Sequence, residues 1–500
     1  MRKLKQLHQL IHSLSMNEKR YFKIFWQGDE EEKTNYFQLF DILNSNKEYE
    51  QEQIELALAD EPFFERLSYL QNYLRQQLLT AMLQFNKDAK HTYITRRLLN
   101  EVDFLYEKNL KGQAKDSLRK LKKLAVEMED LETIYRIHKW ESIFLSLNKA
   151  HKDFGSRMKK VFEDDRLLLE AMEVRQTVKQ VTIYMFDLHS RGVDLRNEEH
   201  RQALDRQMEI LNAVRIPSQF SIMTNHVLQV GKYFYYWLIG DCKNSLKCVQ
   251  VLLQLLKEDT ESENLARRHM FEAIRNCHEV AVILLDEKVK SSMEMEYEQY
   301  ARNVKSSISE REKLLQELIF PSRNLLFQYY SKEFKAAQQL LPAFIQTIQK
   351  KKPLIGKKEY YEAYFIVPFV LFHVSDLEGA LEEVNEALAI STARGYPMKL
   401  HIPMRMLEIM IHFELDNRDL VQSLLRSLQR FLKGNDRLFA SEKHFLKCYR
   451  KLTGLHEAST LKDAFKSAAE VLKEISDSNP LEERMQMDLG LHAYFVRKSL

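Results

Sequence analysis

Apolar residues recur at steps of three and four over most of this chain, the spacing that places side chains on one face of an α-helix. At the start, Leu4, Leu7 and Ile11 follow this spacing. Ser15 stands three residues before Glu18, which is the pattern of a capping box and predicts the start of a second helix. Residues 1–90 are therefore expected to form a module of helices, the last of them running from about residue 63 to 85.

From about residue 91 onward the helical pattern repeats. Each unit has a mostly apolar first helix, a short polar turn, and a second helix that opens with an apolar residue and, three positions later, a small one. The small residue is Ala337, Ala380 and Ser423 in the clearest copies, so it recurs twice at intervals of 43 residues. Ser245 lies 92 residues before Ala337, which equals two steps of 46. The apolar partners are Phe334, Leu377, Leu420 and Cys242, and weaker copies are centred on Ala114 and Ala464.

A period in the forties fits two helices of about five turns each, joined by short turns. The first helix of one unit, residues 359–374, is apolar nearly all round, which is typical of a helix packed between neighbours. The small residue of the second helix has a physical reason, because a larger side chain would separate two helices that cross near a tight turn. Pro342 and Pro368 fall inside predicted helices and are expected to kink them.

The helix–turn–helix unit resembles the tetratricopeptide repeat over about residues 95–475. It departs from that family in its period, since the usual unit has about 34 residues, and it lacks the family's Trp and Pro signature positions. Elongated relatives with units near forty include peptide-sensing regulators whose N-terminal module docks a partner. The resemblance implies an all-α fold, an α-solenoid of stacked antiparallel helix pairs with a concave binding groove.

The expected organisation has three parts. Residues 1–90 form the helical N-terminal module, residues 91–478 the repeat array, and residues 479–500 a terminal capping helix after Asn479 and Pro480. The polar stretch at residues 257–264 is a candidate break between two lobes of the array.

Composition supports the all-helical interpretation. The 500 residues include only 12 Gly and 9 Pro, far below the average of about 7% and 5%, which leaves few turn residues for a β or α/β fold. The 75 basic and 72 acidic residues nearly balance, unlike the strong basic excess typical of nucleic-acid binders. Four scattered cysteines make no disulfide framework. With neither a signal peptide nor an apolar run of about 18 residues, the sequence predicts a cytoplasmic protein without a membrane span.

Motifs for catalysis are missing from the sequence. Neither a phosphate-binding loop nor a nucleophile elbow is present. His8 and His12 share a helix face, as do His444 and Cys448, but neither pair has the further ligands of a zinc site. We therefore expect a non-enzymatic protein that uses no cofactor and no metal.

Two segments are candidate partner contacts. The aromatic run at residues 233–238 contains Tyr235, Tyr236 and Trp237, residue types that are favoured in interfaces; a buried first helix is the alternative. The basic loop at residues 349–361 contains Lys357 and Lys358, which could contact an anionic partner. The alternative for the lysines that end the preceding helix is a favourable interaction with its dipole.

The first 30 residues combine basic and aromatic side chains, and they predict either a docking module, a DNA-binding helix pair, or a set of helices that packs against the first repeats. These side chains are Arg2, Lys3, Lys5, Lys19, Arg20, Lys23, Tyr21, Phe22, Phe25 and Trp26. The leading hypothesis for the whole chain is a scaffold that binds a partner protein or peptide in a superhelical groove. The alternative is a ligand-sensing regulator that contacts nucleic acid through residues 1–90.

Overall fold

The computed structural model is all-α within the residues that it describes. These are residues 2–25, 33–46, 49–59, 61–85, 91–147, 153–258, 263–303, 310–351, 357–391 and 398–500, and none of them forms a strand. Among these residues we find no helix with the length and apolar character that a membrane span requires. The chain divides into two compact units, residues 1–165 (unit 1) and residues 166–500 (unit 2).

Unit 1 contains two groups of helices. The first group is α1 (Arg2–Ser13), α2 (Met16–Phe25), α3 (Lys33–Ser45), α4 (Gln51–Ala59), a 3₁₀ turn (Phe64–Arg66) and α5 (Leu67–Phe85). The second is α6 (His91–Glu107), α7 (Lys111–Glu127) and α8 (Leu131–Ser146), and the unit boundary falls within α9 (Phe154–Arg191). The first group has an apolar core of its own, which extends from Leu4 to Ala81. The expected module boundary at residue 90 lies just outside the described residues.

The capping box is confirmed at the start of α2. The backbone N–H of Ser15 donates to Oε2 of Glu18 at 2.7 Å, and the N–H of Glu18 donates to Oγ of Ser15 at 3.3 Å. Because these two bonds satisfy donors that a helix N-terminus would otherwise leave free, they fix the point where α1 ends and α2 begins.

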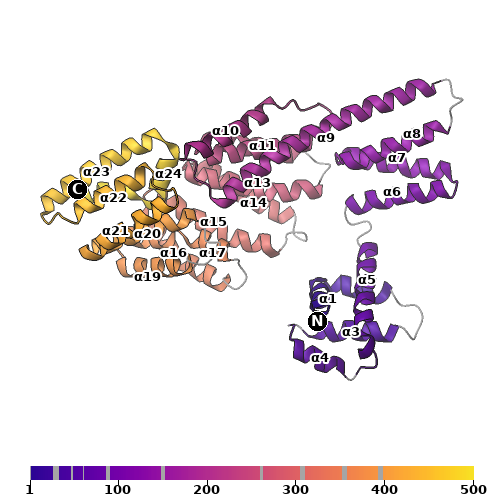
Figure 1. Ribbon diagram of the computed structural model, residues 1–500, viewed down its shortest axis with the longest axis horizontal. Helices are drawn as coiled ribbons and strands as arrows, with labels where there is room; N and C mark the ends of the chain where they lie inside the picture. Colours follow the sequence, from indigo (N-terminus) through magenta and orange to yellow (C-terminus); the bar gives the residue numbers. More distant parts are fainter. Residues whose placement is uncertain are drawn as a thin grey trace. The chain divides into compact units, whose positions relative to one another are not determined.

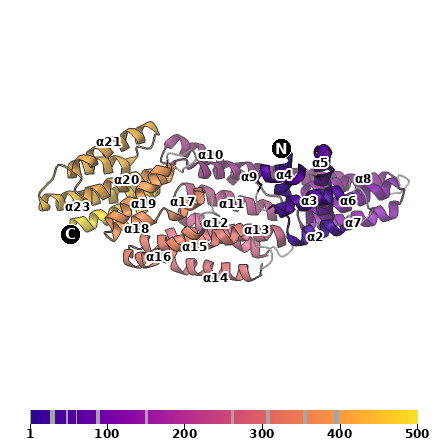
Figure 2. The same ribbon diagram turned by 90° about the horizontal axis from the view of Figure 1, so that it is seen from below.

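Unit 2 is a solenoid-like array in which helices that follow one another in the sequence also pack on one another (Figures 1 and 2). Its helices after α9 are α10 (Glu198–Ala213), α11 (Ile222–Leu238), α12 (Cys242–Glu258), α13 (Glu263–Ile283), α14 (Glu287–Asn303), α15 (Glu310–Tyr330), α16 (Phe334–Lys351), α17 (Lys357–Tyr364), α18 (Val367–His373), α19 (Leu377–Ser391), α20 (Met398–Glu414), α21 (Arg418–Gly434), α22 (Ala440–Leu452), α23 (Ala458–Ser478), α24 (Pro480–Leu489) and α25 (Leu491–Ser499). The expected lobe break lies between α12 and α13, which pack on each other within this unit.

The turns inside the helix pairs share one structure. In the turn between α13 and α14, Leu285 has a φ of 55°, and the N–H of Asp286 donates to the carbonyl of Ala281 at 2.9 Å. Oδ1 of Asp286 then accepts from the N–H of Val289 at 3.0 Å. One short turn therefore closes the first helix in a Schellman-type bond and caps the second. Asp130, Asp241 and Asp376 cap α8, α12 and α19 in the same way.

The small residue that the sequence pattern places near the start of the second helix is buried in three copies. Ser245, Ala337 and Ala380 are inaccessible to solvent, so the copies at these positions are confirmed as second helices. Ser423 is exposed, however, and Val421 takes the buried position in α21. The predicted register of that copy is therefore wrong by two residues. Leu420 misled the pattern because it is 43% exposed and does not face the core.

The sequence missed one second helix, α14. Its equivalent position holds Lys290, which lies 45 residues after Ser245 and is only 7% exposed. Its ammonium group donates to Asn324 at 3.2 Å and to Glu294 at 3.3 Å, and it lies 5.2 Å from the ring centre of Phe327. A long cationic side chain can be buried here because its charge is paired. A search for small residues could not find it.

The apolar segment at residues 359–374 is two helices instead of one. α17 ends at Tyr364 and α18 begins at Val367, with Pro368 in the first turn of α18. Proline lacks the N–H that an inner helical position needs, so it fits best where a new helix begins. The other predicted kink site, Pro342, lies inside a continuous α16.

The C-terminal segment differs from the expected capping helix, because it forms two helices. α24 and α25 are separated by Gly490, which has a left-handed φ of 58°. α24 contacts earlier parts of unit 2: Pro480 lies against Gly240 in the turn between α11 and α12, and Asp488 accepts a hydrogen bond from the hydroxyl of Tyr330 on α15 at 2.6 Å. Figure 1 shows α24 at the junction of the early and late helices of this unit.

Gly490 is predicted to be intolerant of a side chain. An added Cβ would collide with the imidazole of His373 and the hydroxyl of Tyr329, and the left-handed φ would be strained. We expect Gly490→Ala to lower the free energy of unfolding by about 2–4 kcal/mol, measured by urea unfolding. The control is Gly434→Ala at the end of α21, which has open space around it and should change stability by less than about 1 kcal/mol. Equal effects of the two changes would contradict this assignment.

The corrected repeat register makes a second prediction. Ala380→Leu should overpack the crossing of α18 and α19 and destabilise the protein by about 1–3 kcal/mol. Ser423→Leu, at the position that the sequence pattern wrongly aligned with Ala380, is on the surface and should change stability by about 0.5 kcal/mol or less. Differential scanning calorimetry of both variants checks the register, and a larger loss for Ser423→Leu would reject it.

Candidate functional site

Unit 2 encloses a cavity of about 500 Å³. Its helical walls come from α9, α11, α13, α15, α17, α20, α22 and α24, together with residues 192–196 and Arg437 in loops. None of the described lining residues belongs to α12, α14, α16, α19 or α21, which are the second helices of their pairs. The cavity is therefore the inner surface of the array, formed by the first helices of successive pairs and closed by the C-terminal α24.

The wall formed by α11 is aromatic. Tyr233, Phe234 and Trp237 line the cavity, because residues at i, i+1 and i+4 fall on one side of a helix. The rings of Tyr233 and Trp237 are stacked with their centres 6.1 Å apart. Both side chains are only 4% exposed. The wall is therefore a packed apolar surface whose position is fixed by the neighbouring helices.

Arg484 of α24 lies on this wall. Its guanidinium carbon is 4.0 Å from the ring centre of Trp237, close enough for a cation–π interaction. Over the part of the chain that the structure describes, the guanidinium makes no hydrogen bond and no ion pair. Burial lowers the pKa of Arg484, but the negative charge of Asp488 and other nearby groups outweighs burial, so the pKa is raised. The side chain therefore presents a permanent positive charge to the cavity.

The other charged groups on this wall are paired. Arg323 donates to the backbone carbonyl of Arg275 at 2.5 Å and to the carboxylate of Glu279. Arg275 forms an ion pair with Glu272 at 2.5 Å. Burial raises the pKa of Glu279, but the positive charges of Arg323 and Arg275 lower it by more, so the net shift is downward. The carboxylate is therefore ionised, and its partners balance its charge. Nε of Arg275 has no hydrogen-bond partner, but its guanidinium is ion-paired, so among these described arginines Arg484 is the one without an ion pair.

Another part of the cavity lining is a buried charge cluster around Arg196, in the loop between α9 and α10. Its guanidinium forms ion pairs with Asp194 at 2.8 Å, with Glu442 at 2.8 Å and with Glu482 at 3.1 Å. Its side chain is only 8% exposed and lies 4.3 Å from the ring centre of Phe439. We call this set of residues the Arg196 cluster. It joins segments that are 246 and 286 residues apart in the sequence.

Hydrogen bonds complete the Arg196 cluster. Glu482 also accepts from the backbone N–H groups of Ala440 at 3.1 Å and Ser441 at 3.2 Å, which places a carboxylate at the N-terminus of α22. Arg437 donates to the carbonyl of Gly192 at 2.7 Å and forms an ion pair with Asp194. Burial raises the pKa of Asp194, but hydrogen bonding and charge from Arg196 lower it more, so the carboxylate is ionised. The cluster holds charged groups that are fully engaged with one another.

The structure separates the predicted aromatic contact residues. Trp237 lines the cavity, whereas Tyr235 and Tyr236 point elsewhere on α11. The hydroxyl of Tyr235 donates to Asp205 of α10 at 2.8 Å, and burial together with this bond raises the pKa of Tyr235 to about 12. Tyr236 packs against the core that α11 shares with its neighbours. The segment at residues 233–238 has aromatic side chains on several faces because α11 packs against neighbouring helices on several sides.

The two predicted lysines are only partly described. Lys357 and Lys358 begin α17, but their side chains lie outside the described part of the chain. Earlier in the same basic segment, Lys351 at the end of α16 forms an ion pair with Glu317 of α15. Binding of a partner through Lys357 and Lys358 stays a prediction.

Sequence reasoning missed Arg484, Arg196 and their partners. Arg484 follows Asn479 and Pro480 by only a few residues, in a segment that was interpreted as an outer cap. A surface cap would leave such an arginine in solvent, and no local pattern shows that α24 packs inside the array. The alternation of acidic and basic residues from Glu482 to Asp488 resembles an ordinary exposed helix face.

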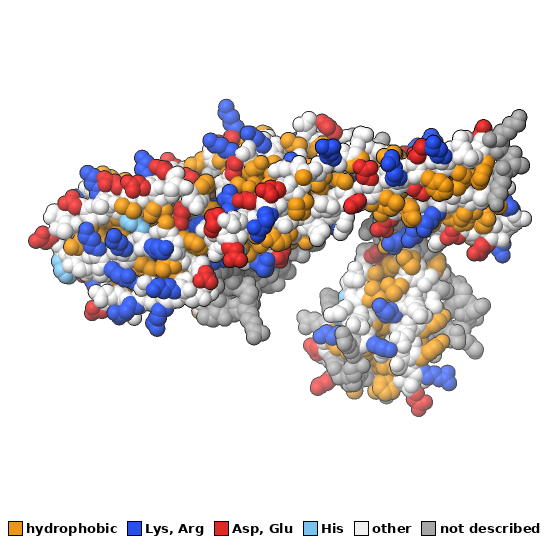
Figure 3. Space-filling view, turned by 45° about the horizontal axis from the view of Figure 1, so that its top comes forward, with side chains coloured by type: hydrophobic (Ala, Val, Ile, Leu, Met, Phe, Trp, Pro, Cys, Tyr) orange, Lys and Arg blue, Asp and Glu red, His pale blue; other side chains and the backbone are white. Residues whose placement is uncertain are grey.

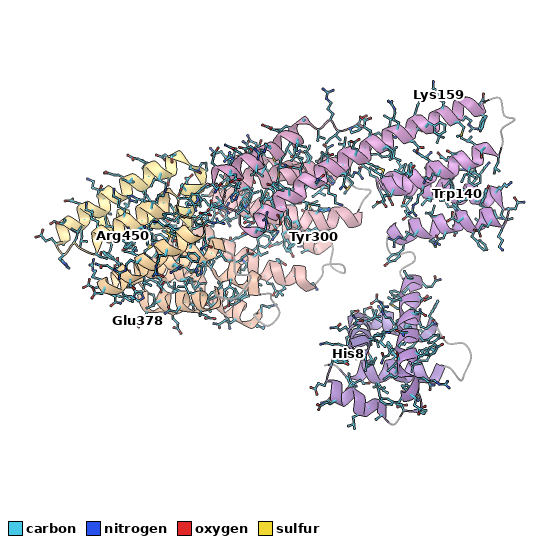
Figure 4. The ribbon with its side chains drawn as sticks, in the orientation of Figure 1. His8, Trp140, Lys159, Tyr300, Glu378 and Arg450 are labelled. Atoms are coloured by element: carbon cyan, nitrogen blue, oxygen red, sulfur yellow. The ribbon has the colours of Figure 1, made fainter. Side chains whose placement is uncertain are left out.

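The histidine pairs have structural roles. Nε2 of His8 lies 2.7 Å from the carbonyl oxygen of Asn46, and Nε2 of His12 lies 2.9 Å from that of Leu43, so both rings hold the C-terminal end of α3. Figure 4 shows His8 among the helices of the N-terminal group. Nε2 of His444 lies 3.2 Å from the carbonyl oxygen of Ala468. The described residues contain no group of three or more His, Cys, Asp or Glu arranged to hold a metal ion.

The basic and aromatic residues at the N-terminus are mostly engaged within their own group of helices. Lys19 donates to Asn44 at 2.8 Å, and Lys23 donates to Asp41 at 2.7 Å. Phe22 is fully buried, and Tyr21 stacks against Phe25. The side chain of Arg2 and the whole of Trp26 lie outside the described residues. Lys3 and Lys5 are exposed, although Lys5 lies 5.9 Å from the ring centre of Tyr49.

Comparisons with protein-family models, with curated proteins and with solved structures find no match for this chain.

The Arg196 cluster makes a third prediction. Arg196→Met would leave Glu442 and Glu482 buried without a cation and should lower the free energy of unfolding by about 3–5 kcal/mol. The control is Arg201→Met on α10, whose ion pair with Asp205 joins side chains that are 34% and 41% exposed and should contribute less than about 1 kcal/mol. Urea unfolding at pH 7 compares the two variants. If they lose the same stability, the cluster does not hold the ends of the unit together.

Proposed function

We propose that this chain is a non-enzymatic, tetratricopeptide-like binding protein and that unit 2 takes up a peptide segment in its internal cavity. The observation that carries the proposal is the origin of the lining, since first helices from successive pairs converge on one cavity while the second helices stay outside it. A superhelical array that binds a ligand does so on its inner surface. The peptide could be free or part of a partner protein.

The size and chemistry of the cavity support a peptide ligand. A volume of about 500 Å³ falls within the range of roughly 300–1,000 Å³ that is usual for ligand sites, and it is too small for a folded domain. The wall combines the rings of Tyr233, Phe234 and Trp237 with the charge of Arg484. Aromatic side chains and arginine are the residue types that contribute most to binding in protein interfaces.

Binding is favoured over catalysis because the acidic groups at the cavity are engaged. Glu279 accepts from Arg323, Glu442 accepts from Arg196, and Asp488 accepts from Tyr330. A general base needs a lone pair directed toward its substrate. The same hydrogen bonds make a rigid wall, which reduces the entropy cost of binding.

The mixed charge on the outer surface of unit 2 favours a binding site inside the array over one on its outer face. Figure 3 shows acidic and basic side chains interspersed over the face of unit 2 that it draws, in keeping with the near-balanced charge of the chain. Second helices present charged residues outward, such as Glu378 on α19 (Figure 4). All four cysteines are buried free thiols, which fits our proposal that the protein works in the cytosol.

A cavity-filling variant tests this proposal. Asn276 of α13 lines the cavity, and Asn276→Trp should fill part of it. The matched control is Asn385→Trp, on the exposed side of α19. The probe is a phage library of random heptapeptides selected against the immobilised full-length protein. We expect a shared peptide consensus with the wild type and the control, and binding of that peptide at least about tenfold weaker with Asn276→Trp.

Two results would contradict the proposal: no consensus with the wild type, or the same affinity for the Asn276→Trp variant. A parallel titration uses fluorescein-labelled duplex DNA and single-stranded RNA at two salt concentrations. Salt-sensitive binding that disappears when Lys3 and Lys5 are changed to Glu would favour the alternative of a regulator that contacts nucleic acid through residues 1–90. Melting temperatures of all variants show that each one is folded.

A further inference from the structure

We propose that Arg484 is an oxyanion-binding residue and that the ligand of the cavity is a peptide that carries a carboxylate to it. This inference rests on the proposed peptide-binding function and names the chemical group that the site recognises. It starts from one imbalance: Arg484 is charged, lines the cavity and has unused hydrogen-bond donors, whereas the neighbouring arginines are paired.

The position of Trp237 leaves the edges of the guanidinium uncovered by the indole ring. The indole ring lies 4.0 Å from the guanidinium carbon, so it covers one face of the planar group. The N–H donors lie in the plane and stay available at its edges. A guanidinium held in this way is prepared to form two parallel hydrogen bonds with a planar, two-oxygen acceptor. A carboxylate has this geometry.

The charges around Arg484 favour an acceptor with a single negative charge. Arg323 is paired with Glu279, and Arg275 with Glu272. Asp488 lies one helical turn after Arg484, and its negative charge contributes to the raised pKa of the arginine. A phosphate monoester would bring nearly two negative charges close to Asp488. A carboxylate brings one negative charge and is therefore repelled less by Asp488.

The surroundings make such an interaction strong enough to select a ligand. Tyr330 donates to Oδ1 of Asp488, the carboxylate whose charge acts most strongly on Arg484. Arg484 is partly buried beside the aromatic wall, where a charge-assisted hydrogen bond is stronger than one on the surface. The ligand's carboxylate belongs either to its C-terminus or to an Asp or Glu side chain.

The first test uses simple carboxylates in place of the peptide. The chain has three tryptophans, Trp26, Trp140 and Trp237, so Trp26→Phe with Trp140→Phe leaves Trp237 as the reporter beside Arg484. Benzoate should change its fluorescence in a saturable way, and benzamide at the same ionic strength should not. Arg484→Gln should weaken benzoate binding about 10- to 100-fold, the loss expected for charge-assisted hydrogen bonds.

Two variants distinguish recognition of benzoate by the guanidinium of Arg484 from a nonspecific effect of positive charge. Arg484→Lys keeps the positive charge without the guanidinium fork and should give an intermediate affinity. Arg426→Gln removes an exposed arginine of α21 and should leave benzoate binding unchanged. If Arg484→Gln and Arg426→Gln behave alike, Arg484 does not bind the oxyanion and the inference is overturned. Urea unfolding of each variant shows that unit 2 is intact.

The second test uses the selected peptides and separates this inference from the proposed function. Loss of binding on C-terminal amidation assigns the terminal carboxylate, and loss on changing Asp or Glu to its amide assigns a side chain. Binding that survives both changes, and survives Arg484→Gln, overturns the inference while the peptide-binding function stands. Benzoate binding that depends on Arg484, with no peptide consensus, supports the oxyanion site and removes the peptide function. If neither benzoate binding nor a peptide consensus is found, both the oxyanion site and the peptide-binding function are rejected.

Discussion

The Arg196 cluster is the interaction on which the rest of unit 2 depends. A helical array built from neighbour contacts has two free ends, and its inner surface is open unless something joins them. Here a single buried guanidinium pairs with carboxylates on α22 and α24, 246 and 286 residues later in the chain. Because a buried charge is costly when unpaired, each partner keeps the others in place. This part of the cavity lining is held together for this reason.

α24 connects this cluster with the candidate site. Glu482 belongs to the Arg196 cluster, Arg484 lies on Trp237, and Asp488 accepts from Tyr330. These three residues fall within two turns of one helix, so the position of the cationic group in the cavity is fixed by the charges that hold the helix. Gly490 then allows the chain to turn sharply into α25, whose Tyr494 and Phe495 are fully buried. The C-terminal segment is therefore an internal part of the unit.

The pairing of consecutive helices has a different, local cause. A left-handed residue followed by an aspartate cap ends one helix and starts the next within a few residues. The strain of a non-glycine residue in that conformation is offset by the capping bonds. Since each turn satisfies its own backbone groups, the array can vary at other positions. It accepts Ser245, Lys290, Ala337 and Val421 at the same crossing position, provided that each is buried with its polar groups paired.

The sequence by itself determined the helical fold, the capping box at Ser15 and the second helices that begin before Ser245, Ala337 and Ala380. These features depend on residues a few positions apart, and their periodicity is visible in one chain. The sequence misplaced the register at Ser423, missed α14, and did not show which face of the aromatic run points inward, because burial depends on neighbouring helices. Tertiary structure alone decided that Trp237 meets Arg484 and that Arg196 meets Glu442 and Glu482. Partners separated by more than 240 residues leave no local signal, since any exposed helix can present the same charges at the same spacing.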